Sequence, residues 1–110
     1  WSVSAALRFT DTMPLAAWSE LARTDAVVLD VREAEEFAAG HIPHAINLPL
    51  SQLRSRYGDL PLDRELYVCC EVGQRAYYAT RFLAQRGYRA RNLSGGYRTY
   101  KALRASGLTP

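Results

Sequence analysis

The 110-residue chain carries a formal net charge of +3 and is 48% hydrophobic, which fits one globular domain and is too short for two. It has no repeat, no apolar run near the roughly 20 residues that span a bilayer, and only two cysteines, so we expect no membrane segment and no disulfide framework. Because no signal peptide is visible, we expect a reducing, cytoplasmic setting. The chain begins at Trp1 without a methionine, which fits a piece of a longer protein.

Charge is distributed unevenly along the chain. Residues 1–71 hold six basic and eleven acidic side chains, whereas residues 72–110 hold eight basic side chains and no acidic one. This asymmetry favours an anionic partner, although a solvated basic face is the commoner explanation. Tyrosines alternate with arginines in the second part, but no nucleic-acid motif accompanies them, so we expect no nucleic-acid partner.

Apolar patterning predicts a domain over residues 12–110 that follows an N-terminal arm or linker over residues 1–11. Continuous apolar runs predict buried strands at 26–31 and 65–70, with shorter strands at 45–48 and 90–93. Helical spacing and caps predict helices at 14–22, 32–40, 50–58, 76–87 and 97–105. The third of these takes Ser51 as its N-cap and Gly58 as its stop.

Strands that alternate with helices indicate an α/β domain, with three layers and a mainly parallel sheet flanked by helices on both faces. In this architecture ligands bind beyond the carboxyl ends of the strands. Asp30, Cys70 and the Gly95-Gly96 turn all follow such ends, so we expect them on one rim.

The two cysteines are adjacent, and strand alternation directs them to opposite faces. We expect Cys69 in the core, because free cysteine is among the most buried residue types. Cys70 opens the loop "CEVGQR", where strand gives way to helix and several backbone N–H groups can converge on one sulfur and stabilise its thiolate. Gly73 allows the loop backbone a conformation that other residues resist. Arg75 either braces the loop or adds positive charge. From these residues alone, a second small buried cysteine remains the commoner interpretation of Cys70.

Three stretches together resemble the signature of the rhodanese-like domain family: "VVLDVREAEEFAAGHIPHAINLPL", "YVCCEVGQRA" and "NLSGGYRTY". The resemblance spans about residues 12–104. The second and third stretches are most similar to the rhodanese domains at the carboxyl end of flavin-dependent coenzyme A-disulfide reductases.

The resemblance implies a sulfurtransferase of rhodanese-like fold that moves sulfane sulfur through a persulfide on Cys70, with no separate catalytic base. The implied donor is thiosulfate or a thiol persulfide, and the implied acceptor is a thiol or cyanide. The implied binding loop consists of Glu71, Val72, Gly73, Gln74 and Arg75. The implied supporting residues are Asp30 and Arg32 as a structural tie, His41 as a hydrogen-bonding anchor, and Gly95, Gly96 and Arg98 on the rim. No metal and no cofactor is implied in this domain, whereas FAD, NAD(P)H and coenzyme A belong to a parent flavoprotein reductase placed before it.

Two positions depart from the family pattern. His44 stands where glycine is usual, and histidine tolerates a left-handed backbone better than most residues. Glu71 stands beside the nucleophile, where its charge opposes a doubly charged oxyanion such as thiosulfate. We therefore expect a donor with a neutral persulfide tip and a distant anionic tail, first coenzyme A persulfide and then glutathione persulfide. Arg98 is expected nearest the rim, and Arg81 and Arg86 are expected to be merely solvated.

Other interpretations are weaker, and one remains open. A cysteine phosphatase loop has the pattern Cys-x5-Arg, but only four residues separate Cys70 from Arg75. A metal site at His41, His44 and the cysteines is rejected, because adjacent cysteines cannot easily bind one ion. A disulfide between adjacent cysteines is strained. The alternative from another class is a non-catalytic rhodanese-like module used for protein contact or regulation.

Overall fold

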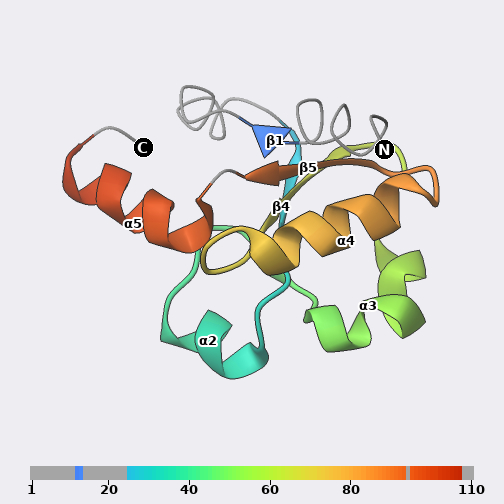
Figure 1. Cartoon of the computed structure of the whole chain (residues 1–110), viewed down its shortest axis with the longest axis horizontal. Coiled ribbons are helices and arrows are strands. Elements are labelled where there is room, and N and C mark those ends of the chain that lie inside the picture. Colours follow the sequence, from blue (N-terminus) through green and yellow to red (C-terminus); the bar gives the residue numbers. More distant parts are fainter. Residues whose placement is uncertain (1–11, 14–24, 94, 108–110) are drawn as a thin grey trace.

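The computed structural model describes residues 12–13, 25–93 and 95–107, and its strands form one five-stranded sheet (Figure 1). The strands are β1 (Thr12–Met13), β2 (Val27–Asp30), β3 (Ile46–Asn47), β4 (Glu65–Cys69) and β5 (Arg89–Leu93). Their spatial order is β1-β5-β4-β2-β3, and every neighbouring pair is parallel. The four predicted strands are confirmed to within two residues at each end. The two-residue edge strand β1 was not predicted.

The helices lie on both faces of this sheet. They are α2 (Ala34–Ala39), α3 (Leu50–Arg56), the short 3-10 helix η2 (Tyr57–Asp59), α4 (Gln74–Ala84) and α5 (Gly96–Ala105). One buried cluster joins β2 and β4 to α3 and α4, and a second joins the opposite face of β4 to α5. In Figure 1, α4 lies over the strands with α3 beside it. This confirms the predicted α/β class. The predicted arm at 1–11 and helix at 14–22 lie outside the described residues.

Helix α4 follows its predicted amphipathic face. Ala76, Ala79 and Leu83 are fully buried against the sheet, and Phe82 is partly buried beside them. The small alanines allow the helix backbone to approach β4 and β5 closely. The amino terminus of α4 is thereby held near the end of β4, and only Glu71, Val72 and Gly73 separate it from Cys70.

The predicted caps of α3 are wrong. The helix begins at Leu50 and ends at Arg56, so Ser51 lies inside the first turn and Gly58 lies in η2. The reason is that the Leu50 N–H donates to the Val31 carbonyl at 2.9 Å, which ties the start of the helix to the end of β2. The Ser51 hydroxyl instead approaches Glu33 Oε2 at 3.4 Å.

The carboxyl ends of the strands form one rim, as predicted. The Val31 N–H donates to the Cys69 carbonyl at 3.0 Å, and the Leu48 N–H donates to the Asp30 carbonyl at 3.0 Å. His44 adopts the expected left-handed conformation, with φ of 67°. The loops that follow β2, β4 and β5 therefore meet at this edge, where the predicted site residues lie.

Candidate active site

Cys70 is the first residue after β4, and its sulfur accepts two backbone hydrogen bonds. The Gly73 N–H donates to Cys70 Sγ at 3.1 Å and the Ala76 N–H donates at 3.2 Å. The loop can turn this tightly because Gly73 has a φ of 109°, which side-chain-bearing residues rarely adopt. The first turn of α4 and the loop before it thus direct two donors at one sulfur atom.

The first turn of α5 holds the loop from the other side. The Tyr97 N–H donates to the Cys70 carbonyl at 2.7 Å, and the Arg98 N–H donates to the Glu71 carbonyl at 3.1 Å. Gly96 permits this approach, because a Cβ atom there would lie 2.3 Å from the Cys70 oxygen.

The orientation of these carbonyls also sets the direction of the loop N–H groups. In a planar trans peptide, the N–H points opposite to the carbonyl that precedes it. The N–H groups of Glu71 and Val72 therefore point away from α5, and neither finds an acceptor among the described residues. Both remain available to a ligand.

Cys69 and Cys70 lie on opposite faces of the sheet, as the strand alternation predicts, and each belongs to a different buried cluster. Both are free thiols. Burial, followed by the charge of Asp30, raises the pKa of the Cys69 thiol far above its ordinary value. Cys69 is therefore a core residue without thiolate character at neutral pH.

Cys70 is more enclosed than its position in a loop suggests. It is only 1% exposed, because the loop folds over its sulfur and α4 packs beside it. A reagent must enter between Cys70 and the surrounding backbone to reach the sulfur. The expected difference in reactivity between Cys69 and Cys70 therefore rests on the N–H donors at Cys70 and not on solvent exposure.

Asp30 and Arg32 form a buried ion pair at the end of β2. Arg32 Nη2 lies 2.8 Å from Asp30 Oδ2, and Nε donates to both carboxylate oxygens at 3.0 and 3.2 Å. Arg32 also donates to the Gly40 carbonyl at 2.8 Å, and its guanidinium lies 4.5 Å from the centre of the Tyr97 ring. The pair thus connects β2, the end of α2 and α5, which is the structural arrangement expected for these residues.

The Glu71 carboxylate lies between two arginines. One of its oxygens is 3.4 Å from Arg32 Nη1, and the other is 4.0 Å from Arg98 Nε. Arg32 is already committed to Asp30, and the Arg98 side chain is 71% exposed to solvent. The rim beside Cys70 therefore carries an acidic group that is only partly neutralised.

Arg75 braces the loop, which is one of the two roles predicted for it. Its guanidinium makes a two-pronged contact with Glu36 of α2, at 2.8 and 2.9 Å. These bonds and the charge of Arg75 lower the pKa of Glu36 to about 2. Because Glu36 pairs with it, the positive field of Arg75 at the sulfur is reduced by the opposite charge of that carboxylate.

The remaining predicted residues lie around this centre. The His41 Nδ1–H donates to the Phe37 carbonyl at 2.8 Å and its ring stacks on Phe37, so His41 anchors the end of α2. Val72 is 49% exposed at the crest of the loop, and Gln74 is exposed at the start of α4. Among the described residues, no group of three or more metal-binding side chains gathers.

The site also includes Glu36, Asn92 and Tyr97, which the sequence patterns did not indicate. Glu36 is 39 residues from its partner Arg75, so only the fold reveals their contact. Asn92 is a buried polar residue near the end of β5, and its amide donates to the Gly73 carbonyl at 3.4 Å. A buried asparagine in a strand beside a functional loop was the signal that could have identified it. Tyr97 packs under Arg32.

The fold and this geometry define an α/β domain with one cysteine in a strand–loop–helix turn. Residues 13–103 match the family model described as the rhodanese-like domain, and the chain belongs to this family. The resemblance inferred from the three sequence stretches is thereby confirmed. No described helix is long and apolar enough to cross a membrane.

Three relatives illustrate the range of the family. A sulfurtransferase of Allochromatium vinosum is 40% identical over 66% of this chain and 68% of its own length. The thiosulfate:glutathione sulfurtransferase of Homo sapiens is 37% identical over 74% of this chain and 84% of its own length. The crystal structure of reduced Bacillus anthracis CoADR-RHD superimposes with a TM-score of 0.76 and 36% identity, over 81% of this chain and 16% of that one.

The Glu36–Arg75 contact predicts a pH-dependent loss of stability. Glu36 has a depressed pKa in the folded state, so its contribution is complete above the ordinary carboxyl pKa of about 4.3 and disappears as the pH falls through about 2. Glu36→Gln, which keeps the helix cap, is expected to lower the free energy of unfolding by about 0.5–1 kcal/mol at pH 7, since the pair is partly exposed.

Thermal unfolding of the wild type and of Glu36→Gln between pH 7 and pH 2, followed by circular dichroism, checks this. The difference in free energy of unfolding between the two proteins should shrink across that interval and vanish near pH 2. Glu35→Gln in the same helical turn, with an exposed side chain, is the matched control. A difference that is constant with pH, or equally large for Glu35→Gln, contradicts the assignment.

Proposed function

We propose that this domain is a sulfurtransferase that carries sulfane sulfur as a persulfide on Cys70. The observation that supports this most directly is the pair of N–H groups that donate to Cys70 Sγ at 3.1 and 3.2 Å. Such donors stabilise an anionic sulfur, which is the form that attacks.

The proposed reaction has two balanced steps and no net redox change. In the first step, the Cys70 thiolate attacks the outer sulfur of a donor R–S–SH, the donor S–S bond breaks, and R–S⁻ leaves with the bonding electrons. In the second step, an acceptor thiolate or cyanide attacks the outer sulfur of the Cys70 persulfide and restores the Cys70 thiolate. The N–H groups of Glu71 and Val72, which have no acceptor among the described residues, could donate to the outer sulfur and its negative charge.

The charges of the rim favour a donor whose reacting end is neutral. Glu71 is only partly neutralised by Arg32 and Arg98, and Arg75 is neutralised by Glu36. A thiosulfate dianion must approach against this field, whereas a protonated persulfide tip does not. We therefore propose a thiol persulfide as the donor, coenzyme A persulfide before glutathione persulfide. The human relative, by contrast, is named for thiosulfate and glutathione.

The domain also has a proposed setting within a longer protein. The chain spans only 16% of the CoADR-RHD chain that it resembles. We propose that it works beside a flavoprotein reductase domain, which would use FAD and NAD(P)H, while this domain needs no cofactor of its own. The competing function, a non-catalytic module for protein contact, gives the Cys70 sulfur no role beyond accepting these two N–H groups.

The covalent mechanism predicts ping-pong kinetics. Initial rates measured with a thiol persulfide donor and cyanide as acceptor should give parallel double-reciprocal lines, because the first product leaves before the acceptor binds. Cys70→Ser should lose the transfer activity by at least about a thousandfold, while Cys69→Ala should keep most of it. Intersecting lines contradict the persulfide intermediate, and a folded wild-type protein without turnover favours the non-catalytic module.

The role of Glu71 predicts a change of donor preference. Glu71→Gln removes one negative charge from the rim, so kcat/KM for thiosulfate should rise about three- to tenfold at low ionic strength, and less at high salt. The value for a persulfide with a neutral tip should change by less than about twofold. Asp63→Asn makes the same charge change at the opposite end of β4 and should alter neither value. Equal effects on both donors would contradict the electrostatic explanation.

A further inference from the structure

Both N–H donors to the Cys70 sulfur depend on the position of Gly73. Gly73 donates its own N–H to Sγ at 3.1 Å, and it is the N-cap of α4, whose third residue, Ala76, donates the other N–H at 3.2 Å. Gly73 has no side chain with which to cap the helix, so Sγ accepts the Ala76 N–H in place of a cap oxygen. A displacement of Gly73 therefore moves both donors relative to the sulfur.

Asn92 of β5 supports Gly73 from the sheet. Asn92 pairs in register with Val68, so its side chain lies on the face of the sheet that carries Val68 and Cys70. Its Nδ2 donates to the Gly73 carbonyl at 3.4 Å, a long hydrogen bond, and lies 4.0 Å from the place that a Gly73 Cβ would occupy. The Tyr77 N–H donates to the same carbonyl at 3.0 Å. The carbonyl is thus held between α4 and Asn92.

The Asn92 side chain is an expensive choice for a buried position. It is 8% exposed, and its Oδ1 has no hydrogen-bond partner among the described residues. A buried acceptor without a partner lowers stability, because it loses its hydrogen bonds to water without replacement. Its neighbours on this face, Val68 and Ala90, belong to an apolar cluster that would accept a leucine. Stability alone does not explain an asparagine here, whereas the contact with Gly73 does.

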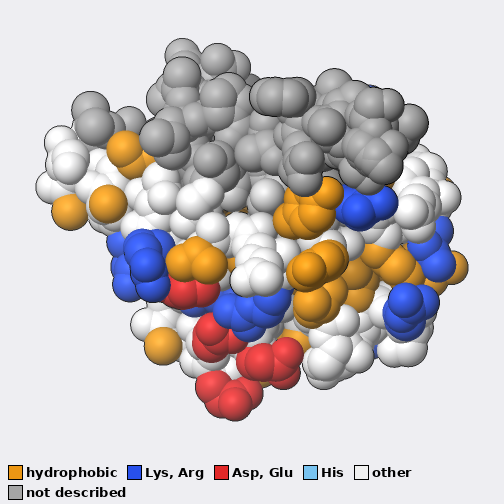
Figure 2. Space-filling model, in the orientation of Figure 1, with side chains coloured by type: hydrophobic (Ala, Val, Ile, Leu, Met, Phe, Trp, Pro, Cys, Tyr) orange, Lys and Arg blue, Asp and Glu red, His pale blue; other side chains and the backbone are white. Residues whose placement is uncertain are grey.

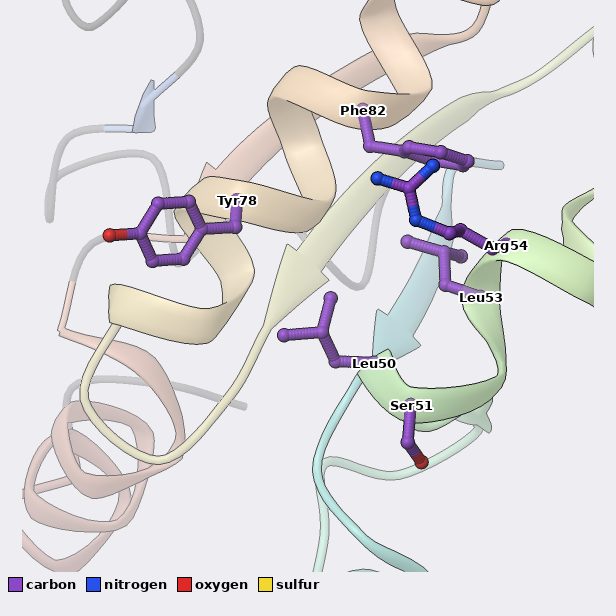
Figure 3. Close-up of a pocket in the computed structure, with 6 residues that line it drawn as sticks. All are labelled: Leu50, Ser51, Leu53, Arg54, Tyr78 and Phe82. Atoms are coloured by element: carbon purple, nitrogen blue, oxygen red, sulfur yellow. The ribbon is translucent and has the colours of Figure 1, made fainter.

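The opposite side of α4 does not supply this support. A pocket of about 340 Å³ lies between α3 and α4, and its lining residues are Leu50, Ser51, Leu53, Arg54, Tyr78 and Phe82. None of them belongs to the loop after β4, which turns into α4 on the Tyr78 side of the pocket (Figure 3). Among the described residues, Asn92 is the one side chain from another element that donates a hydrogen bond to the backbone of this loop.

The charged groups around the sulfur make no hydrogen bond with Asn92 in the part of the chain that the structure describes. Each of them is paired elsewhere, and the set consists of Asp30, Arg32, Glu71, Arg75 and Arg98. Figure 2 shows the acidic side chains gathered over α2, with basic ones beside them. Replacing Asn92 with an uncharged residue thus leaves these charges in place and removes the support of Gly73.

We propose that Asn92 is a positioning residue for sulfur transfer, which holds Gly73 so that both N–H groups stay directed at Cys70 Sγ and maintain its thiolate. The inference rests on the proposed function, in which the thiolate attacks, and adds to it the residue that keeps the donors in place. Asn92 acts through Gly73 and makes no hydrogen bond to the sulfur itself. Loss of its amide should therefore lower the thiolate fraction at a given pH.

A pH titration of the Cys70 thiol tests the proposal without any sulfur donor. In a Cys69→Ala background, Cys70 is the one cysteine left, and its ¹³C-labelled Cβ reports the thiolate by its chemical shift. Asn92→Leu should raise the midpoint by about 0.3–1 pH unit, the two- to tenfold change in thiolate that corresponds to one hydrogen bond. Asn92→Ala, which cannot crowd the loop, should shift it in the same direction. Thr80→Val is the matched control, because it removes another buried oxygen without a described partner, and should leave the midpoint unchanged.

Unfolding in urea separates a positioning role from a purely structural one. Asn92→Leu removes an unpaired acceptor, so its free energy of unfolding should equal or exceed that of the background protein although its midpoint is raised. An unchanged midpoint in both Asn92 variants, with or without a loss of stability, overturns the proposal. An equal rise in Thr80→Val overturns it as well. Absence of sulfur transfer in the wild type refutes the proposed function alone, since the titration does not depend on transfer.

Discussion

The hydrogen bonds from the first turn of α5 to the carbonyls of Cys70 and Glu71 are the constraint on which the site depends. A helix begins with N–H groups that have no partner within the helix, and here two of them bind the loop after β4. Because these carbonyls point toward α5, the N–H groups of Glu71 and Val72 point away from it. The loop therefore presents hydrogen-bond donors, and not acceptors, to its interior. Gly96 is required for this contact, because any side chain there would collide with the loop carbonyls.

The charged residues around this contact hold the loops in place and also select what enters. The Asp30–Arg32 pair is almost completely buried, and Arg32 uses its remaining donors on Gly40 and Glu71. Removing one partner of such a pair typically costs about 3–5 kcal/mol, because the other charge stays buried. Glu71 contacts Arg32 at the edge of this network, so the Asp30–Arg32 pair helps to fix the position of the Glu71 carboxylate. The charge of that carboxylate then acts on the approaching donor.

Much of this arrangement was predictable from local patterns, and the missing parts depend on contacts between distant segments. The alternation of Cys69 and Cys70 follows from the strand period of two, and the burial of Ala76 and Leu83 follows from helical spacing. The cap at Ser51 was wrong because the Leu50 N–H bonds to β2 instead. The Glu36–Arg75 pair was not predictable, because side chains 39 residues apart in sequence meet only after folding. The near-complete burial of Cys70 has the same origin, since α4 and the loop enclose it together.

The N–H groups of Gly73 and Ala76 that donate to Cys70 Sγ make Cys70, and not Cys69, the proposed carrier of sulfur. Mass spectrometry of the intact chain after exposure to a thiol persulfide, followed by proteolytic mapping with a thiol-blocking reagent, tests it most directly. Cys70 is expected to gain one sulfur atom, which is retained in Cys69→Ala, absent in Cys70→Ser and removed by cyanide. Sulfur located on Cys69, or no added sulfur on the folded wild-type protein, would contradict it.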